Sequence, residues 1–419
     1  MAGISRDRIV TLDIIRGIAV MGIFSVNVVA FAMIDGAYFN PAAYGGHSGV
    51  DLALWMTNMV VVDGKLRSLF SMLFGASMLL VAERAEAAGE SAWSLHARRM
   101  LVLFLIGLAH FYLLWWGDIL HLYAAVGLAA FLFRYRSAGE LFAWALLFML
   151  ADVALFGAIV AGIHQLDVAA HAHGAAADVI RRWNDIAQGF YPSAAQLAAD
   201  QAIYGGSYLT RLQEMLTDRL AEPLEDIRLL GAETLALMLF GMWGYKSGFL
   251  TGTWPDRGYA RVALITIPLG AVVFAAIVAV DIRSGFYLPY VFGGLSAASA
   301  PFRPVMAFGY AALIILATRR GGWLAERLAA VGRTAFTNYL GTSLVAAFVF
   351  YGWGLGLYGQ VSRAEAWLLV PAVWLAMLLW SKPWLDRFNY GPLEWLWRSL
   401  ARWEMQRMRK GAAPAAATG

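Results

Sequence analysis

The sequence contains no cysteine and few charged residues. Of its 419 residues, none is Cys and only 14% are Asp, Glu, Lys or Arg, whereas soluble domains carry about 25% charged residues. The lack of cysteine excludes disulfides, thiol catalysis and cysteine-ligated metals. The low charge, combined with 60% hydrophobic residues and a mean hydropathy of +0.61, predicts an all-α polytopic transmembrane bundle.

The apolar residues occur in long runs separated by short charged segments. Runs of about 20 apolar residues are long enough to cross a bilayer, and the sequence predicts about ten spans. Their approximate limits are 11–33, 53–82, 98–116, 118–134, 139–163, 229–250, 259–280, 298–318, 333–352 and 365–381. Lys and Arg collect in alternate connections, which places the N-terminus and the C-terminus in the cytoplasm. The first run is expected to be an uncleaved span, because Asp13 and Arg16 lie at its start and a second span follows.

The order of these runs predicts four regions. Residues 1–163 form an N-terminal transmembrane bundle, and 229–400 form a C-terminal transmembrane domain. Between them, 164–228 mixes charged residues with amphipathic stretches, which predicts a small helical extracytoplasmic insertion. Residues 401–419 form a basic tail that is disordered beyond about 411.

Neither a metal site nor a nucleic-acid site is expected. The insertion contains His164, His171 and His173, but a solvated Ala/His linker explains these histidines better than a metal site does. The net charge of +4 is spread over short loops between spans, which gives no basis for nucleic-acid binding.

The stretch from Gly107 to Tyr123, GLAHFYLLWWGDILHLY, is typical of a membrane hairpin that carries titratable groups. His110 lies about 18 Å along a crossing of about 30 Å. Asp118 is expected at the outer surface, where it either caps the next helix or orients a histidine as a general base. His121 shares a face with Asp118 and is an alternative to His110. Ionisable residues inside a membrane are functional candidates by default.

Polar side chains recur near the expected cytoplasmic ends of the first and ninth spans. Asp13 and Arg16 are three residues apart, so they share a helix face and can pair, and Asn27 returns to that face about three turns later. Arg333 begins the ninth span, and Asn338 lies on a polar stripe of that span. These residues either bind an anionic ligand or only hold helices together.

The second run is too long for one straight crossing. We expect it to break at Asp63-Gly64-Lys65, because non-helical backbone at this depth is tolerated where it is buried or lines a cavity. Lys65 and Arg67 follow the break and need carboxylates, carbonyls or water as partners. A phosphate group would use both cations directly.

The motifs that carry these residues resemble the bacterial YeiB family of membrane proteins. They are RIVTLDIIRGIAVMGIFSVNV, DGKLRSLFSMLFG, HFYLLWWGDIL, GRTAFTNYLGTSLVAAFVFYGWGLGLYG and GPLEWLWR. The resemblance extends from about Arg8 to Arg398 and implies a multi-pass protein of the bacterial inner membrane. The N-terminal half is similar to transmembrane acyltransferases that include heparan-α-glucosaminide N-acetyltransferase. This similarity implies a cytoplasmic site for acyl-CoA, in particular acetyl-CoA, and an extracytoplasmic acceptor site with a catalytic histidine.

The resemblance favours a transmembrane acyltransferase. In the heparan enzyme the catalytic histidine lies in the outer loop after the first span, where the nearest equivalent here is His47. His110 fits the YeiB pattern better and ranks first, with His47 as its rival. Cations low in the bundle would bind the phosphates of acyl-CoA, and the acceptor hydroxyl or amine would belong to an envelope glycan or lipid. The cations are Arg16, Lys65, Arg67 and Arg333.

Two other functions remain open. The intramembrane cations and the broken second span also suit a transporter of a small anionic metabolite, although the two halves show no clear internal repeat. Alternatively, the polar stripes only lock the helices of a structural membrane protein. Membrane lipid is an expected partner, and the resemblance points to a homodimer.

Overall fold

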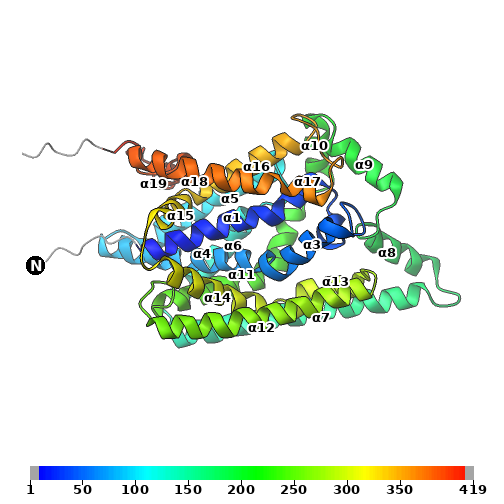
Figure 1. Cartoon of the computed structure of the whole chain (residues 1–419), viewed down its shortest axis with the longest axis horizontal. Coiled ribbons are helices and arrows are strands. Elements are labelled where there is room, and N and C mark those ends of the chain that lie inside the picture. The colour runs from blue at the N-terminus through cyan, green and yellow to red at the C-terminus, as the bar shows by residue number, and fades with distance from the viewer. Residues whose placement is uncertain (1–8, 411–419) are drawn as a thin grey trace, which may run out of the picture.

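The computed structural model describes residues 9–410, and every regular element in this range is helical (Figure 1). The N-terminal half contains α1 (Val10–Ala32), α2 (Gly36–Phe39), α3 (Gly49–Thr57), the π-helix η1 (Asn58–Val62), α4 (Lys65–Ala87), α5 (Ala92–Leu113), α6 (Leu120–Phe131) and α7 (Ala138–Ala170). Helices α8 (Ala177–Gln188), α9 (Ala194–Tyr204) and α10 (Tyr208–Thr217) follow. The C-terminal half contains α11 (Glu222–Lys246), α12 (Asp256–Arg283), α13 (Leu288–Gly293), the π-helix η2 (Gly294–Ala298), α14 (Phe302–Thr318), α15 (Trp323–Arg333), α16 (Ala335–Phe350), α17 (Arg363–Trp367), α18 (Leu369–Arg387) and α19 (Pro392–Arg402).

The long apolar helices make the chain a multi-pass membrane protein. Seven helical stretches within residues 9–410 are long and apolar enough to cross a bilayer, and an eighth forms if α13–η2 and α14, bent by 55°, count as one broken span. The shorter apolar helices α6 and α16 coincide with the two remaining predicted spans. The predicted break in the second span is confirmed, since η1 ends at Val62 and α4 begins at Lys65.

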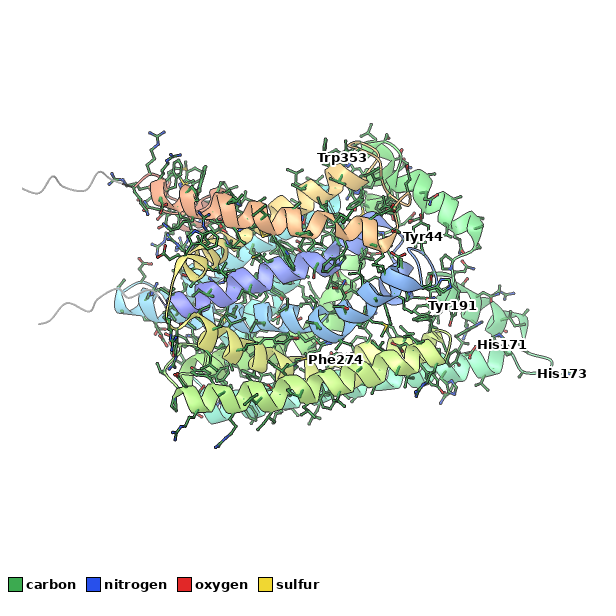
Figure 2. The ribbon with its side chains drawn as sticks, viewed as in Figure 1. Tyr44, His171, His173, Tyr191, Phe274 and Trp353 are labelled. Carbon is green, nitrogen blue, oxygen red and sulfur yellow. The ribbon has the colours of Figure 1, made fainter. Side chains whose placement is uncertain are left out.

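The helices run roughly parallel between two distinct ends (Figure 1). The start of α1 and helix α19 lie at one end, which we call the basic end because most of the loops rich in Arg and Lys gather there. Helices α8, α9 and α10 lie at the other end, which we call the capped end. His171 and His173 lie at its far tip, next to the end of α7 (Figure 2). The predicted disorder beyond 411 lies outside the described residues.

The bundle is layered around α1, α4 and α11. Helices α15, α16 and α18 cover one side of this central layer, while α7, α12 and α14 cover the other (Figure 1). One buried apolar cluster centres on α4, α11 and α14, and a second lies between α1, α16 and α18. The central layer therefore contacts protein on both sides, as its largely buried residues require.

The predicted insertion between the two halves is helical and covers the capped end. Arg219, which follows α10, binds three carboxylates, those of Asp35 at 2.6 Å, Glu214 at 2.7 Å and Glu222 at 3.4 Å. Burial lowers the pKa of the Arg219 guanidinium, but the carboxylates outweigh this effect and raise its pKa above the ordinary value. The connection between α10 and α11 is thereby tied to the loop after α1.

Helices α4 and α11 pack with their backbones in contact at Gly241. A Cβ at this position would lie 1.7 Å from the carbonyl oxygen of Met72, so Gly241→Ala must push the helices apart. We expect a loss of about 1–3 kcal/mol in unfolding free energy, measured by thermal denaturation in detergent. The control is Gly157→Ala on α7, where a Cβ meets no atom within 4 Å. Equal melting temperatures for the two variants would contradict this prediction.

Candidate functional site

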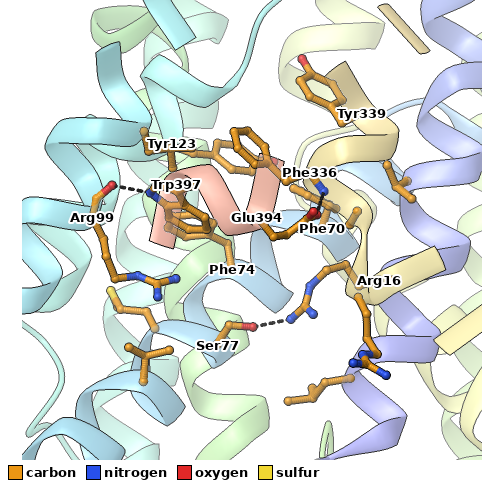
Figure 3. Close-up of a pocket in the computed structure, with 18 of the residues that line it drawn as sticks. Arg16, Phe70, Phe74, Ser77, Arg99, Tyr123, Phe336, Tyr339, Glu394 and Trp397 are labelled. Carbon is orange, nitrogen blue, oxygen red and sulfur yellow. Dashed lines mark hydrogen bonds between the residues drawn. The ribbon is translucent and has the colours of Figure 1, made fainter. Parts of the chain in front are cut away.

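A cavity of about 470 Å³ lies between α1, α4, α5, α6, α15, α16 and α19 (Figure 3). Its lining on α1 extends from Ile9 to Ile23, which corresponds to about 21 Å along the helix. The cavity therefore reaches from the basic end to about the middle of the bundle.

Arginines surround the part of the cavity nearest the basic end. They are Arg16, Arg84, Arg99, Arg333 and Arg398.

Arg16 is held in place on the cavity wall. Its guanidinium binds the Asp13 carboxylate at 3.0 Å and donates to the Ser77 hydroxyl at 2.5 Å (Figure 3), which confirms the predicted pairing of Asp13 with Arg16. The acidic residues of the lining are Asp13 and Glu394. Five cations against two carboxylates give this end of the cavity a positive field, which suits a polyanion.

Helix α19 forms one wall of the cavity and is anchored at two points. The Glu394 carboxylate accepts hydrogen bonds from the backbone N–H groups of Phe336 at 2.7 Å and Thr337 at 3.1 Å, at the start of α16 (Figure 3). Burial raises the pKa of the Glu394 carboxyl, although the Thr337 hydrogen bonds oppose this shift. The Trp397 indole donates to the Arg99 carbonyl at 2.9 Å, and the Arg99 guanidinium lies 4.3 Å from the indole ring. The wall is therefore tied to both α5 and α16.

Aromatic residues close the inner end of the cavity. Tyr123 and Tyr339 line it there (Figure 3), and the Tyr339 ring lies 5.5 Å from the His110 ring, measured between centroids. The Tyr339 hydroxyl is buried and has no hydrogen-bond partner among the described residues. His110 does not line the cavity itself, because Tyr339 lies between them.

His110 and Asp118 form a buried pair behind this aromatic wall. The His110 Nδ1 lies 2.6 Å from the Asp118 Oδ2, and the side chains are 3% and 0% exposed. An ionised carboxylate only accepts hydrogen bonds, so Nδ1 carries the proton in this pair. The His110 Nε2 is buried without a hydrogen-bond partner within residues 9–410. It therefore retains a lone pair that can take up a proton.

Asp118 also binds His121, so both histidines share one carboxylate. The Asp118 Oδ1 accepts hydrogen bonds from the backbone N–H groups of Leu120 at 2.8 Å and His121 at 3.1 Å, and the His121 Nδ1 lies 3.0 Å away. Asp118 thus caps α6 and pairs with histidine at the same time. The His121 Nε2 lies 3.5 Å from the Asp226 carboxylate, whose side chain is 36% exposed. A chain of polar groups therefore extends from His110 to the solvent near the start of α11.

The predicted position of Asp118 at the outer surface is wrong. Asp118 is buried, and a Cβ on Gly107 would lie 2.4 Å from the backbone nitrogen of His121. The start of α6 is therefore level with Gly107, about 9 Å before the end of α5 at Leu113. The connection between α5 and α6 turns back into the bundle, and the Arg211 side chain of α10 binds the Leu113 carbonyl above it at 3.1 Å.

The other predicted site residues lie outside the cavity. Lys65 contacts the backbone of η1, and Arg67 binds Glu233 on α11. Asn338 is buried and accepts a hydrogen bond from the Trp380 indole at 2.9 Å. Asn27 is partly buried near the other end of α1, and His47 is exposed in the loop before α3. The structure thus gathers only Asp13, Arg16 and Arg333 of the predicted ligand-binding set.

Comparison with known proteins gives consistent matches along the chain. Residues 244–404 match a family model described as "Protein of unknown function (DUF418)". The chain is 30% identical over 412 residues to the uncharacterized protein YeiB of Escherichia coli (strain K12), covering 94% of this chain and 96% of YeiB. The chain belongs to the YeiB family. It is also 31% identical over 416 residues to the uncharacterized protein YxaH of Bacillus subtilis (strain 168), covering 94% of each. No solved structure matches.

Sequence reasoning missed several groups of this YeiB-family protein that surround the cavity and the histidine pair. In the sequence, Arg84 and Arg99 are two of the many charges next to the apolar runs, and Arg398 is the last residue of the GPLEWLWR motif. Tyr339 and Asp226 carry no sequence signal, because a tyrosine in an apolar helix and an acid near the start of a helix are both common. Their importance depends on which helices pack together, which the sequence pattern does not specify.

Proposed function

We propose that this YeiB-family protein is a transmembrane acyltransferase that moves an acyl group from cytoplasmic acyl-CoA to a hydroxyl or amine on the extracytoplasmic side. The observation that supports this proposal most is the placement of the buried His110–Asp118 pair directly behind the aromatic wall of an arginine-lined cavity. The proposal places the basic end in the cytoplasm, by the positive-inside rule, and the protein in the bacterial inner membrane.

The cavity suits a CoA thioester in charge and length. The phosphates of CoA would bind the arginines at the basic end, where guanidinium groups form bidentate, charge-assisted hydrogen bonds. The pantetheine arm would extend along the apolar and aromatic lining toward Tyr123 and Tyr339. Its extended length is on the order of the 21 Å covered by the cavity along α1. The thioester would then lie next to Tyr339, on the cavity side of His110.

His110 would act as a general base oriented by Asp118. Its Nε2 would accept the proton of the acceptor hydroxyl or amine as that group attacks the thioester carbonyl. An acyl–oxygen or acyl–nitrogen bond forms, the acyl–sulfur bond breaks, and the CoA thiolate takes the proton from His110. The reaction requires Tyr339 to move aside, because its ring separates His110 from the cavity.

The acceptor would approach from the capped end. Asp226 is partly exposed there and lies next to His121, which shares Asp118 with His110. This chain of groups would hold the acceptor and pass protons to solvent. An acceptor on an envelope glycan or lipid is consistent with a site near the outer membrane surface.

Calorimetric titration of acetyl-CoA into the purified protein tests the donor site. We expect wild type to bind, and Arg333→Ala to bind about 10- to 100-fold more weakly, because a hydrogen bond to a charged group contributes about 1.5–3 kcal/mol. Arg320→Ala is the control, since Arg320 is an exposed arginine in the connection before α15 that does not line the cavity. Lys65→Ala is expected to leave binding unchanged.

The absence of binding to acetyl-CoA, longer acyl-CoAs and free CoA would contradict the proposal. Uptake of a small anionic metabolite into proteoliposomes without acyl-CoA would then favour the transporter.

A further inference from the structure

A second polar region lies in the membrane interior, away from the arginine-lined cavity. Glu233 of α11 binds two arginines, Arg67 of α4 and Arg303 of α14, the latter at 2.6 Å. Asp152 of α7 interacts electrostatically with the same two arginines. Ionisable groups are expensive in a membrane interior, so a cluster of this kind calls for an explanation beyond helix packing.

Two π-helical segments flank this region. The Lys65 ammonium donates to the Met59 carbonyl of η1 and lies 3.0 Å from the centroid of the Phe274 ring. The Arg303 guanidinium donates to the Leu295 carbonyl of η2. Short π-helical segments occur frequently at functional sites, and interrupted helices at membrane depth commonly surround ion sites in transporters.

A small cavity of about 20 Å³ lies between the two π-helical segments. This volume accommodates one water molecule or one ion of similar size. Most of its lining is apolar, with Phe274 and Val291 among the wall residues. Its polar groups belong to Asp63, Asp281 and Ser299 and to the indole N–H of Trp55.

Asp281 is the acidic residue of this cavity that has a carboxylate oxygen without a partner; among the described residues the indole N–H of Trp55 also lacks one. Asp281 is 4% exposed, and its Oδ1 is buried with no hydrogen bond to any described residue. No ion pair involving Asp281 occurs within residues 9–410, whereas Asp63 accepts a hydrogen bond from the Tyr38 hydroxyl. A buried carboxylate is costly unless a cation or hydrogen-bond donors compensate it.

The charges around the cavity do not balance. The cations are Lys65, Arg67 and Arg303, and the carboxyl groups are Asp63, Asp152, Glu233 and Asp281. Three cations against four carboxyl groups leave one negative charge when all are ionised. Tyr38 contacts Asp63, and His164 and Asp167 of α7 both contact the Tyr287 hydroxyl in the connection after α12.

We propose that this cavity binds a single monovalent cation, a proton or a sodium ion, at the Asp281 carboxylate. One positive charge neutralises the region and supplies the partner that the Asp281 Oδ1 lacks. Asp63 and Ser299 line the same cavity and can supply further oxygen ligands, which suit hard cations. The site does not depend on the acyltransferase proposal, because it shares no lining residue with the arginine-lined cavity.

Thermal denaturation of the full-length protein in detergent tests this proposal. Melting temperatures are measured at pH 8 in sodium chloride and in choline chloride of equal ionic strength, and in choline chloride from pH 5 to pH 8. A sodium site raises the melting temperature by about 2–4 °C, saturably with sodium concentration. A proton site shows no sodium effect, but the wild type gains stability relative to Asp281→Asn as the pH falls.

Asp281→Asn is expected to abolish whichever dependence the wild type shows. It is also expected to melt at a higher temperature than wild type in choline chloride at pH 8, because it removes an uncompensated buried charge. If Asp281 had a purely structural role, Asp281→Asn would melt at a lower temperature than wild type under these conditions. Asp185→Asn on α8, which is exposed, is the control and should behave like wild type. A wild type and an Asp281→Asn variant with the same response to sodium and to pH would overturn the proposal.

Discussion

Replacing His110 with alanine is expected to lower acyl transfer by about 10²–10⁴-fold, the usual contribution of a positioned general base. The imidazole is the group of the buried pair that keeps a free nitrogen, since its Nδ1 is committed to Asp118 at 2.6 Å. The assay follows release of the CoA thiol from acetyl-CoA by purified protein in the presence of an acceptor-containing envelope extract. Binding of acetyl-CoA should be unchanged, because His110 does not line the cavity.

His47→Ala is the matched control for this experiment. His47 is the rival histidine suggested by the resemblance to the heparan enzyme, and it is exposed in the loop before α3. We expect His47→Ala to keep wild-type turnover. If His47→Ala lost activity and His110→Ala kept it, His47 and not His110 would be the catalytic histidine. Circular dichroism of both variants establishes that neither change unfolds the bundle.

Glu233→Gln is expected to cause the largest loss of stability among single substitutions in the bundle. Its carboxylate binds both Arg67 and Arg303 and is only 3% exposed. Breaking a buried ion pair by removing one partner costs about 3–5 kcal/mol, because the remaining charges stay buried without compensation. Thermal denaturation in detergent should show a lower melting temperature and a lower yield of folded protein.

Glu225→Gln on the same helix separates this effect from a general loss of charge. Glu225 pairs with Arg228 near the capped end, and the two side chains are 44% and 71% exposed. Exposed pairs contribute about 0–1 kcal/mol, so this variant should melt close to wild type. If both glutamine variants melted at the same temperature, the ion pairs of Glu233 with Arg67 and Arg303 would not contribute more to stability than an exposed pair does.

Local sequence patterns predicted the helices and several of their polar contacts. Spans as apolar as α1 and α12 have no alternative to a helix within a bilayer, because every backbone group must be satisfied internally. The pairings of Asp13 with Arg16 and of His110 with Asp118 were also predictable, because each joins residues at most eight positions apart. The break before α4 followed from the glycine and charges at Asp63–Lys65.

Contacts between side chains that are far apart in the chain could not be predicted from the sequence. Lys65 and Arg67 looked like ligands for an anion, but Arg67 binds Glu233, which lies 166 residues away in the chain. Asn338 looked like a site residue and instead binds Trp380. The buried position of Asp118 could not be predicted for the same reason. After Leu113 the chain turns back into the bundle, and this turn depends on how α10 covers the connection between α5 and α6.

Because α6 is short and begins inside the bundle, the distance between the arginine-lined cavity and the capped end is also short, and this affects how a membrane voltage acts on the protein. An arginine-lined cavity enters the bundle from the basic end, while Asp226 brings solvent close to His121 from the capped end. If ions and water entered both spaces, the insulating thickness between them would be the layer around Tyr339 and His110. A membrane voltage would then fall mainly across this layer, and the local field there would exceed the average over the bilayer. A charge that crossed between Tyr339 and Asp226 would therefore experience most of the membrane potential within a short distance.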